Sequence, residues 1–271
     1  MSKRQLRRID HFSRMALLAA GKAIQDADPG VFIKEKTGVI VASGYGALST
    51  TFAFLDSYLE KGDDLASPIL FSNSVHNAAA AHISICYGIQ GPSLTISQFD
   101  MSFICALLSA GIWLEEGKVD SVLVGSSDEY CDVLGYCIHG LSFEKKKAYS
   151  FSEGATFFLV SDTKKNPSRY GWFDQVTMGN YEKDKIEIPE DSDLILSASS
   201  TNPSTNAFLN HSGRALKNNT FNRRHCFSPT DSSIDAAFAT QLSKKISYIK
   251  LGRNKEYGKI IIHTNDKIEF E

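Results

Sequence analysis

The stretch from Gly91 to Glu129 constrains the fold more than any other part of the sequence. After a Gly-Pro break it contains a short apolar run, Leu94 to Ser97, and then a segment whose apolar residues recur at three- and four-residue spacing. That spacing predicts a helix, and the small residues between the apolar ones leave it without an extended polar face. Gly117 ends this helix, and Val119 to Gly125 is typical of a buried strand. Such a helix belongs in the middle of a domain.

The residues before this stretch alternate between helix and strand patterns. Ile9 to Ala27 has a helical period with Asp10 as its N-cap, and Thr37 to Ala42 is a predicted strand. The glycine turn that follows, Ser43 to Gly46, resembles a phosphate-binding loop only in its glycines, because the spacing and the lysine of such loops are missing. The other predicted helices run from about Ser49 to Leu59, closed by Gly62, and from His82 to Gly88.

The later residues carry weaker patterns. They predict, in chain order, strands at Trp172 to Met178 and Leu194 to Ala198, an amphipathic helix from Asp231 to Tyr248, and strands at Lys259 to His263 and Lys267 to Phe270 joined by a turn at Asn265-Asp266.

Composition excludes several classes of function. The net charge is −2, from 29 basic and 31 acidic residues among 271. The chain therefore lacks the excess of basic residues that binding to nucleic acid or to a membrane surface would favour. No stretch approaches the roughly 20 apolar residues of a membrane span, and the basic start is followed by an amphipathic segment rather than an export signal. The five cysteines are odd in number and lack CxxC spacing, which favours reduced thiols in the cytoplasm over disulfides or a metal site.

Four segments together resemble the β-ketoacyl synthases of the thiolase superfamily. They are RRIDHFSRMALLAAGKAIQDA, TGVIVASGYG, SVHNAAAAHISICYGIQGPSLT and FSEGATFFLV, which follow the family's order over about residues 5–162. The resemblance implies a thiolase-like α/β fold with α-β-α-β-α layers in two related halves, residues 1–163 and 164–271, packed as one unit. The chain is shorter than the family's usual length and lacks its opening strand.

The resemblance also indicates which catalytic residues are replaced. Aligning GPSLTIS with the family's GPSxxVS puts Asp100 where ketosynthases carry their cysteine nucleophile. By looser alignments Ser199 stands at the first histidine and Asp231 at the second, and the HGTG and GHxxGA patterns are absent. A carboxylate lacks the nucleophilicity and leaving-group character of a thiolate, so we predict no catalytic residues.

Plainer interpretations of the same residues are retained. Asp100 would be a good N-cap for the central helix. Cys105 lies five residues further on, about 140° round that helix, so we interpret it as a small buried hydrophobe and not as a displaced nucleophile. By resemblance the dimer interface comprises His76, Asn77, Ser93, Leu94, Thr95, Ile96 and Ser97.

These inferences predict a non-catalytic subunit of the chain-length-factor type. It would pair with an active ketosynthase in type II fatty-acid or polyketide-like synthesis, with aryl polyene and flexirubin pigments as candidate products. No cofactor or metal is expected; any acyl chain would be carried on the phosphopantetheine of an acyl carrier protein. Two alternatives stay open: an enzyme of altered chemistry that uses Asp100 or Asp231 on acyl thioesters, and a homodimeric acyl-binding scaffold. If active, the chain would act as a 3-oxoacyl-ACP-synthase-like acyltransferase within a heterodimer.

Overall fold

The computed structural model describes residues 6–141, 153–162, 168–198, 233, 235–237, 244–252 and 254–265. Its helices and strands, in chain order, are α2 (His11–Asp26), β1 (Thr37–Ala42), α3 (Leu48–Lys61), α4 (Pro68–Ser74), α5 (Ala78–Tyr87), β2 (Ser93–Ile96), α6 (Ser102–Glu115), β3 (Ser121–Asp128), α7 (Asp132–Leu141), β4 (Gly154–Ser161), β5 (Gly171–Asn180), β6 (Asp193–Ala198), β7 (Lys245–Leu251) and β8 (Glu256–Thr264). Within these residues no helix combines the length and apolar character that crossing a membrane requires.

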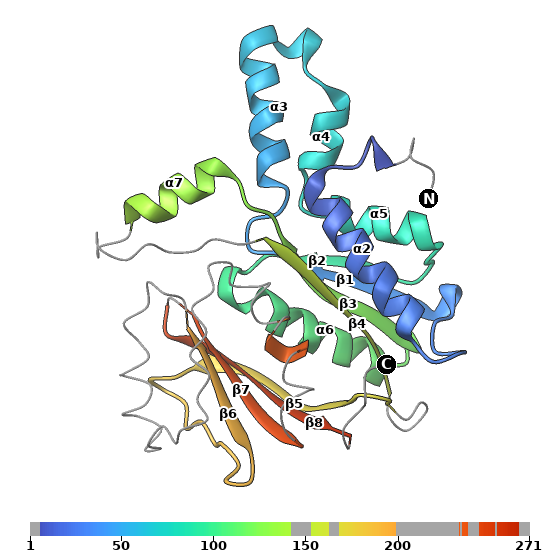
Figure 1. The fold of residues 1–271 in the computed structure, drawn as a ribbon, viewed down its shortest axis with the longest axis vertical. Coiled ribbons are helices and arrows are strands. Elements are labelled where there is room, and N and C mark those ends of the chain that lie inside the picture. The colour runs from blue at the N-terminus through green and yellow to red at the C-terminus, as the bar shows by residue number, and fades with distance from the viewer. Residues whose placement is uncertain are drawn as a thin grey trace.

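The first sheet has the order β2-β1-β3-β4, in which β4 alone is antiparallel to its neighbour. Because side chains alternate along a strand, Val39 and Val41 of β1 face α2 and α5, whereas Ile40 and Ala42 face α6. Both faces of this sheet are therefore covered by helices (Figure 1). A parallel sheet buried on both sides explains why β1 is a continuous apolar run.

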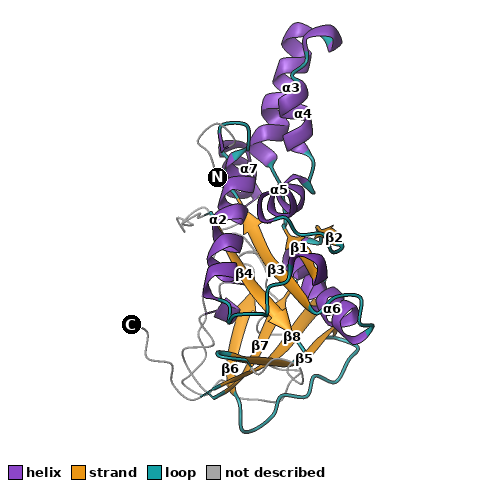
Figure 2. Cartoon of the chain, turned by 90° about the vertical axis from the view of Figure 1, so that its right-hand side faces the viewer, coloured by secondary structure: helices purple, strands orange, loops and turns teal. Residues whose placement is uncertain are grey.

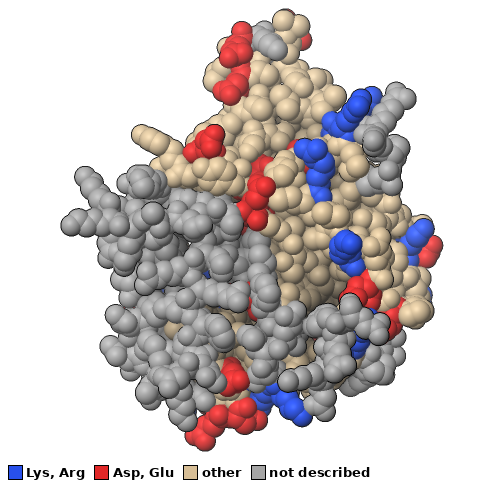
Figure 3. Space-filling view, viewed as in Figure 1, with Lys and Arg blue, Asp and Glu red and all other residues tan. Residues whose placement is uncertain are grey.

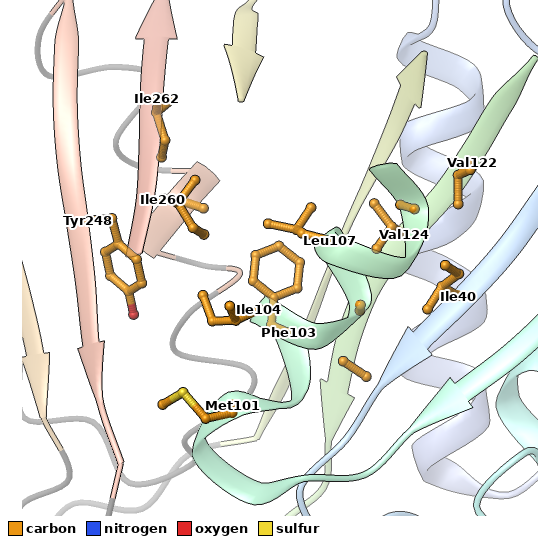
Figure 4. Packing of buried hydrophobic residues seen from close by; sticks show 14 of the residues in the cluster. Ile40, Met101, Phe103, Ile104, Leu107, Val122, Val124, Tyr248, Ile260 and Ile262 are labelled. Carbon is orange, nitrogen blue, oxygen red and sulfur yellow. The ribbon is translucent and has the colours of Figure 1, made fainter. Parts of the chain in front are cut away.

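The second sheet, of order β5-β8-β7-β6, packs against the opposite side of α6. Phe103, Ile104 and Leu107 of α6 lie between the two sheets, and Tyr248 and Ile260 close the cluster from the second sheet (Figure 4). Each such side chain contributes about 1.5–3 kcal/mol when fully buried. The central position predicted for the apolar helix is confirmed.

The short helical pair formed by α3 and α4 projects away from both sheets (Figures 1 and 2). Large apolar side chains on this pair and the adjoining residues stay exposed: Leu55, Tyr58, Leu59, Leu65, Ile69, Phe71 and Val75.

Two sequence-based predictions need correction. Residues 245–248, predicted as the end of a helix, begin strand β7 instead. Ile246 falls by chance on the helical spacing of the preceding residues, but both faces of β7 are buried, and the run of β-branched and aromatic residues suits a central strand. The helix predicted to begin at His82 begins at Ala78. The strand predicted at Lys267 to Phe270 lies outside the described residues.

Candidate functional site

The turn between β2 and α6 is tightly fixed. Phe99 adopts a φ of 42°, the left-handed region that non-glycine residues seldom occupy. The Ser102 hydroxyl accepts a hydrogen bond from the Gln98 amide at 2.7 Å and lies within donating distance of the Phe99 carbonyl (2.9 Å) and the Ser43 carbonyl (3.1 Å). These contacts hold the turn against the end of β1, so Asp100, the residue after Phe99, has a defined position.

Asp100 occupies that position and is 3% exposed. It belongs to a 3₁₀ turn, Phe99–Met101, that precedes α6. The N-cap of α6 is Met101, with no side-chain capping bond, so the prediction that Asp100 caps this helix is wrong. The extra 3₁₀ turn places Asp100 too early to meet the first amides of α6. Asp100 is instead buried within this turn, which packs against β7 and β8 of the second sheet.

The end of β3 contributes a second buried carboxylate that sequence reasoning missed. Asp128 Oδ1 accepts hydrogen bonds from the Ser43 hydroxyl at 2.7 Å, the Gly44 amide at 2.9 Å and the Tyr45 amide at 3.3 Å. The glycine turn after β1 thus directs its amides at an internal carboxylate. This observation agrees with the interpretation that the turn is not a phosphate-binding loop.

Glu129, the next residue, is also buried. Its Oε1 accepts a hydrogen bond from the Ser49 amide at 2.8 Å, in the first turn of α3. Burial raises the pKa of the Glu129 carboxyl, and the bond from Ser49 opposes that rise only in part.

The second sheet brings a buried cation to the same end of α6. Lys250 is 1% exposed, and its Nζ donates to the Ser197 hydroxyl at 3.2 Å. Lys250 pairs with Gly258, whose backbone lies against Ile104 in the first turns of α6. A lysine inside the apolar run ISYIKL was the sequence signal for this residue. Ser199, which follows β6, and Asp231 lie outside the described residues.

The cysteine nearest the turn is poorly suited to be a nucleophile. Cys105 Sγ lies 3.4 Å from Gln98 Oε1 and 3.7 Å from Met178 Sδ. Burial raises the pKa of the Cys105 thiol, which disfavours the reactive thiolate. No cluster of three or more His, Cys, Asp or Glu side chains with metal-binding geometry occurs among the described residues.

Most of the residues predicted to form an interface belong to β2, which is an edge strand among the described residues. Alternate residues of a parallel strand bond to the same neighbour. Because the carbonyls of Pro92 and Ile96 accept bonds from β1, the backbone groups of Ser93 and Thr95 point away from it. Between β2 and α5 lies a groove of about 310 Å³, lined by Asn77, Ala81, Ser84, Ile85, Ser93, Leu94 and Thr95.

The interface residues are only partly gathered there. The groove brings together Asn77, Ser93 and Thr95 with Leu94, whereas exposed His76 lies beside Gly46. The hydroxyl oxygens of Ser84 and Thr95 are buried and have no hydrogen-bond partner among the described residues. Buried polar atoms without partners are uncommon and point to a missing contact.

The sequence profile of the family described as "Beta-ketoacyl synthase, N-terminal domain" matches residues 1–162, more than half of the chain. The chain belongs to this family. Two relatives are the 3-oxoacyl-[acyl-carrier-protein] synthase 2 of Vibrio cholerae, 27% identical over 139 residues (50% of this chain, 33% of the relative), and the chloroplastic synthase I of Arabidopsis thaliana, 26% identical over 127 residues (45% and 27%). The chain spans about a third of the length of these curated relatives.

Solved structures resemble this chain over nearly its whole length. The ishigamide ketosynthase/chain length factor has a TM-score of 0.78 at 17% identity, covering 95% of this chain and 81% of that one. A ketosynthase of Burkholderia phymatum has a TM-score of 0.71 at 11% identity, covering 97% and 85%. At such identities the likeness concerns the fold alone. The fold is the expected thiolase-like α/β fold in a shortened form.

Proposed function

We propose that this chain is a non-catalytic, ketosynthase-like subunit of the chain-length-factor type. It pairs with an active β-ketoacyl-ACP synthase in type II fatty-acid or polyketide-like synthesis, of which aryl polyene or flexirubin assembly is one form. The observation that carries the proposal is Asp100, a buried carboxyl group at the turn where the family's alignment puts the nucleophilic cysteine.

The chemistry of the turn supports the loss of acyl transfer. Attack by the Asp100 carboxylate on a thioester would give a mixed anhydride, which water or any nucleophile opens without selectivity. The nearby Cys105 thiol is a poor replacement because burial raises its pKa. Ser199 and Asp231, at the aligned histidine positions, offer no imidazole to stabilise an enolate.

The free edge of β2 supports the pairing. An open strand edge with outward backbone groups is a template for another strand. Beside it Ile85 is 77% exposed, and it lines the groove together with Ser84 and Thr95. The exposed apolar residues of the projecting α3–α4 pair add a second contact area, which Figure 3 shows as largely uncharged. A partner that covers these surfaces would pair the open edge of β2 and bury the exposed apolar side chains.

Co-expression with the ketosynthase encoded beside this chain tests the pairing. Native mass spectrometry should find one stable complex with one copy of each subunit. Ile85→Asp should weaken the complex at least about tenfold, because it buries a charge in the interface. Leu18→Asp is the matched control, since Leu18 is also exposed (67%) but lies on α2, away from β2. Two proteins that migrate independently would contradict the proposal, and a tight self-dimer would favour the scaffold alternative.

The altered-enzyme alternative is motivated by two buried titratable side chains, Asp100 in the turn and Lys250 on β7. Incubation with acyl- and malonyl-carrier protein, followed by intact-mass measurement and thioester assay, distinguishes the two functions. We expect no adduct on this chain and the same thioester loss with the wild-type chain and with Asp100→Asn. Turnover abolished by Asp100→Asn would establish the enzyme instead.

A further inference from the structure

An apolar cavity of about 320 Å³ lies beside the C-terminal half of α6, where β4 of the first sheet approaches β5 of the second. Its apolar walls come from these three elements: Leu107, Leu114, Phe158, Val160, Phe173 and Val176. The rings of Phe158 and Phe173 meet edge to face, with their centroids 5.7 Å apart, and so join the two sheets at this point. The volume lies at the small end of the range of about 300–1,000 Å³ that is typical of ligand sites.

Small residues on α6 leave room in this cavity. Ala110 and Gly111 both line it, and a Cβ added at Gly111 would meet no atom of the described residues within 4 Å. Protein interiors are normally packed with few voids larger than a water molecule. The side chains around such a space lose dispersion contacts, which an apolar ligand would restore.

The charged groups of the cavity lie together at its rim and are mostly acidic. Arg169 is the only cationic residue among the described lining residues, and its Nη1 lies 3.7 Å from Oδ1 of Asp26. The Tyr170 hydroxyl donates to Oδ2 of the same carboxylate at 2.5 Å. Asp28, a second carboxylate at the rim, is exposed. The rim therefore carries one negative charge more than Arg169 balances.

Two helix ends add to this negative potential. Helix α2 ends at Asp26 and α6 ends one residue after Leu114, and both of these residues line the cavity. The C-terminus of a helix carries a partial negative charge, which basic side chains usually compensate. Neither helix has a basic residue in its last turn, and Lys118, just beyond α6, pairs with Glu116 at 2.6 Å. A cation at the rim would be favoured by both helix ends and by Asp28.

We propose that this cavity binds a linear apolar molecule with a cationic end, of the alkylamine class. Its hydrocarbon chain would lie along Leu107 and Leu114, and its ammonium group would lie beside Asp28. An anionic end, as in a fatty acid, would be repelled by the rim. The inference goes beyond the proposed function, because neither Asp100 nor any residue of the β2 groove lines this cavity.

Tryptophan fluorescence tests the site, because Trp172 lines the cavity and stacks on the His263 ring at 4.9 Å. Trp113→Phe leaves Trp172 as the only tryptophan. Decylamine, added below the concentration at which it forms micelles, should change the Trp172 emission saturably with one molecule bound per chain. Decanoate should bind about tenfold more weakly, and decanol should lie between the two. Octylamine, which is two methylenes shorter, should bind roughly tenfold more weakly than decylamine.

Two substitutions in the Trp113→Phe background separate the apolar and the charged parts of the site. Gly111→Leu should fill part of the cavity and weaken the binding of decylamine and decanol at least about tenfold, with folding checked by circular dichroism. Asp28→Asn changes only an exposed side chain, so it should fold normally, reduce the preference for decylamine over decanol and leave decanol binding unchanged. Asp56→Asn, an exposed carboxylate on α3, is the matched control and should change neither affinity.

Three results would each overturn the proposal. The first is the absence of a saturable change in Trp172 emission with decylamine. The second is equal affinity for decylamine and decanoate, which would show that the rim does not select a cation. The third is undiminished binding to folded Gly111→Leu, which would place the ligand elsewhere on the protein.

Discussion

Two adjacent buried carboxyl groups at the end of β3, Asp128 and Glu129, accept different numbers of hydrogen bonds. Asp128 accepts bonds from a hydroxyl and two backbone amides, which compensate its burial. Glu129 accepts a bond from the Ser49 amide, and burial raises the pKa of its carboxyl. Asp128 therefore fixes the glycine turn, whereas ionised Glu129 lowers the stability of the folded state.

Glu129 should give the folding stability a definite pH dependence. Its folded pKa lies above the ordinary value of 4.5, so the folded state keeps a proton that the unfolded state has already lost. Unfolding then releases a proton, and the free energy of unfolding falls as pH rises from about 4.5 through the folded pKa. Glu129→Gln should remove this fall while keeping an oxygen for the Ser49 amide.

Urea unfolding of both proteins at closely spaced pH values between about 4 and 7 measures this difference. Glu187→Gln is the matched control, because it makes the same chemical change at an exposed position. Parallel profiles for the wild type and Glu129→Gln would show that Glu129 does not titrate differently in the two states.

At the scale of elements, the sequence predicted strands and helix ends that are set by neighbouring residues in the chain. Strand β1 was predicted with its observed bounds, and the Asp10 side chain accepts from the Ser13 amide at 2.8 Å, as an N-cap should. Helices α4 and α7 and strand β7 were not found; α4 spans only seven residues, and β7 is recognised by its burial between two strands.

The candidate site divides in the same way. Alignment to GPSxxVS located Asp100 because that motif is contiguous in the sequence. Asp128 and Lys250 join the site only through sheet pairing, which sets residues far apart in the chain side by side. No short catalytic motif marks either residue, and the lysine inside the run ISYIKL, the one sequence signal for Lys250, does not show which residues lie opposite it.

Two glycines in neighbouring elements should respond to alanine in opposite directions. A Cβ at Gly111 on α6 meets nothing within 4 Å, so Gly111→Ala should stabilise the protein by about 0.5–1 kcal/mol through helix propensity. A Cβ at Gly125 on β3 would clash with the Thr156 carbonyl oxygen, so Gly125→Ala should cost about 1–3 kcal/mol or more. Urea midpoints measure both changes. A stabilising Gly125→Ala would mean that β3 and β4 are farther apart than described here.

At the scale of the molecule, one apolar cluster joins both sheets. It contains Ile40 and Val122 from the first sheet, Phe103 from α6, and Ile246 and Ile260 from the second. Helix α6 covers the inner faces of both sheets, because the two sheets pack against opposite sides of that helix (Figure 4). Of the two halves suggested by the sequence, 1–163 and 164–271, the second therefore relies on α6 of the first to cover the inner face of its sheet.

Shared burial of this kind predicts a single cooperative unfolding transition. The chain has two tryptophans, Trp113 on α6 beside Gly38 of the first sheet and Trp172 on β5 of the second. Trp113→Phe and Trp172→Phe each leave one fluorescent reporter, and in each variant its urea midpoint should coincide with that from circular dichroism. Ile104→Ala, which removes contacts to the second sheet at Gly258, should shift both reporters together by the equivalent of about 2–5 kcal/mol. Two separate midpoints, or a shift confined to Trp172, would instead mean that the halves fold as separate domains.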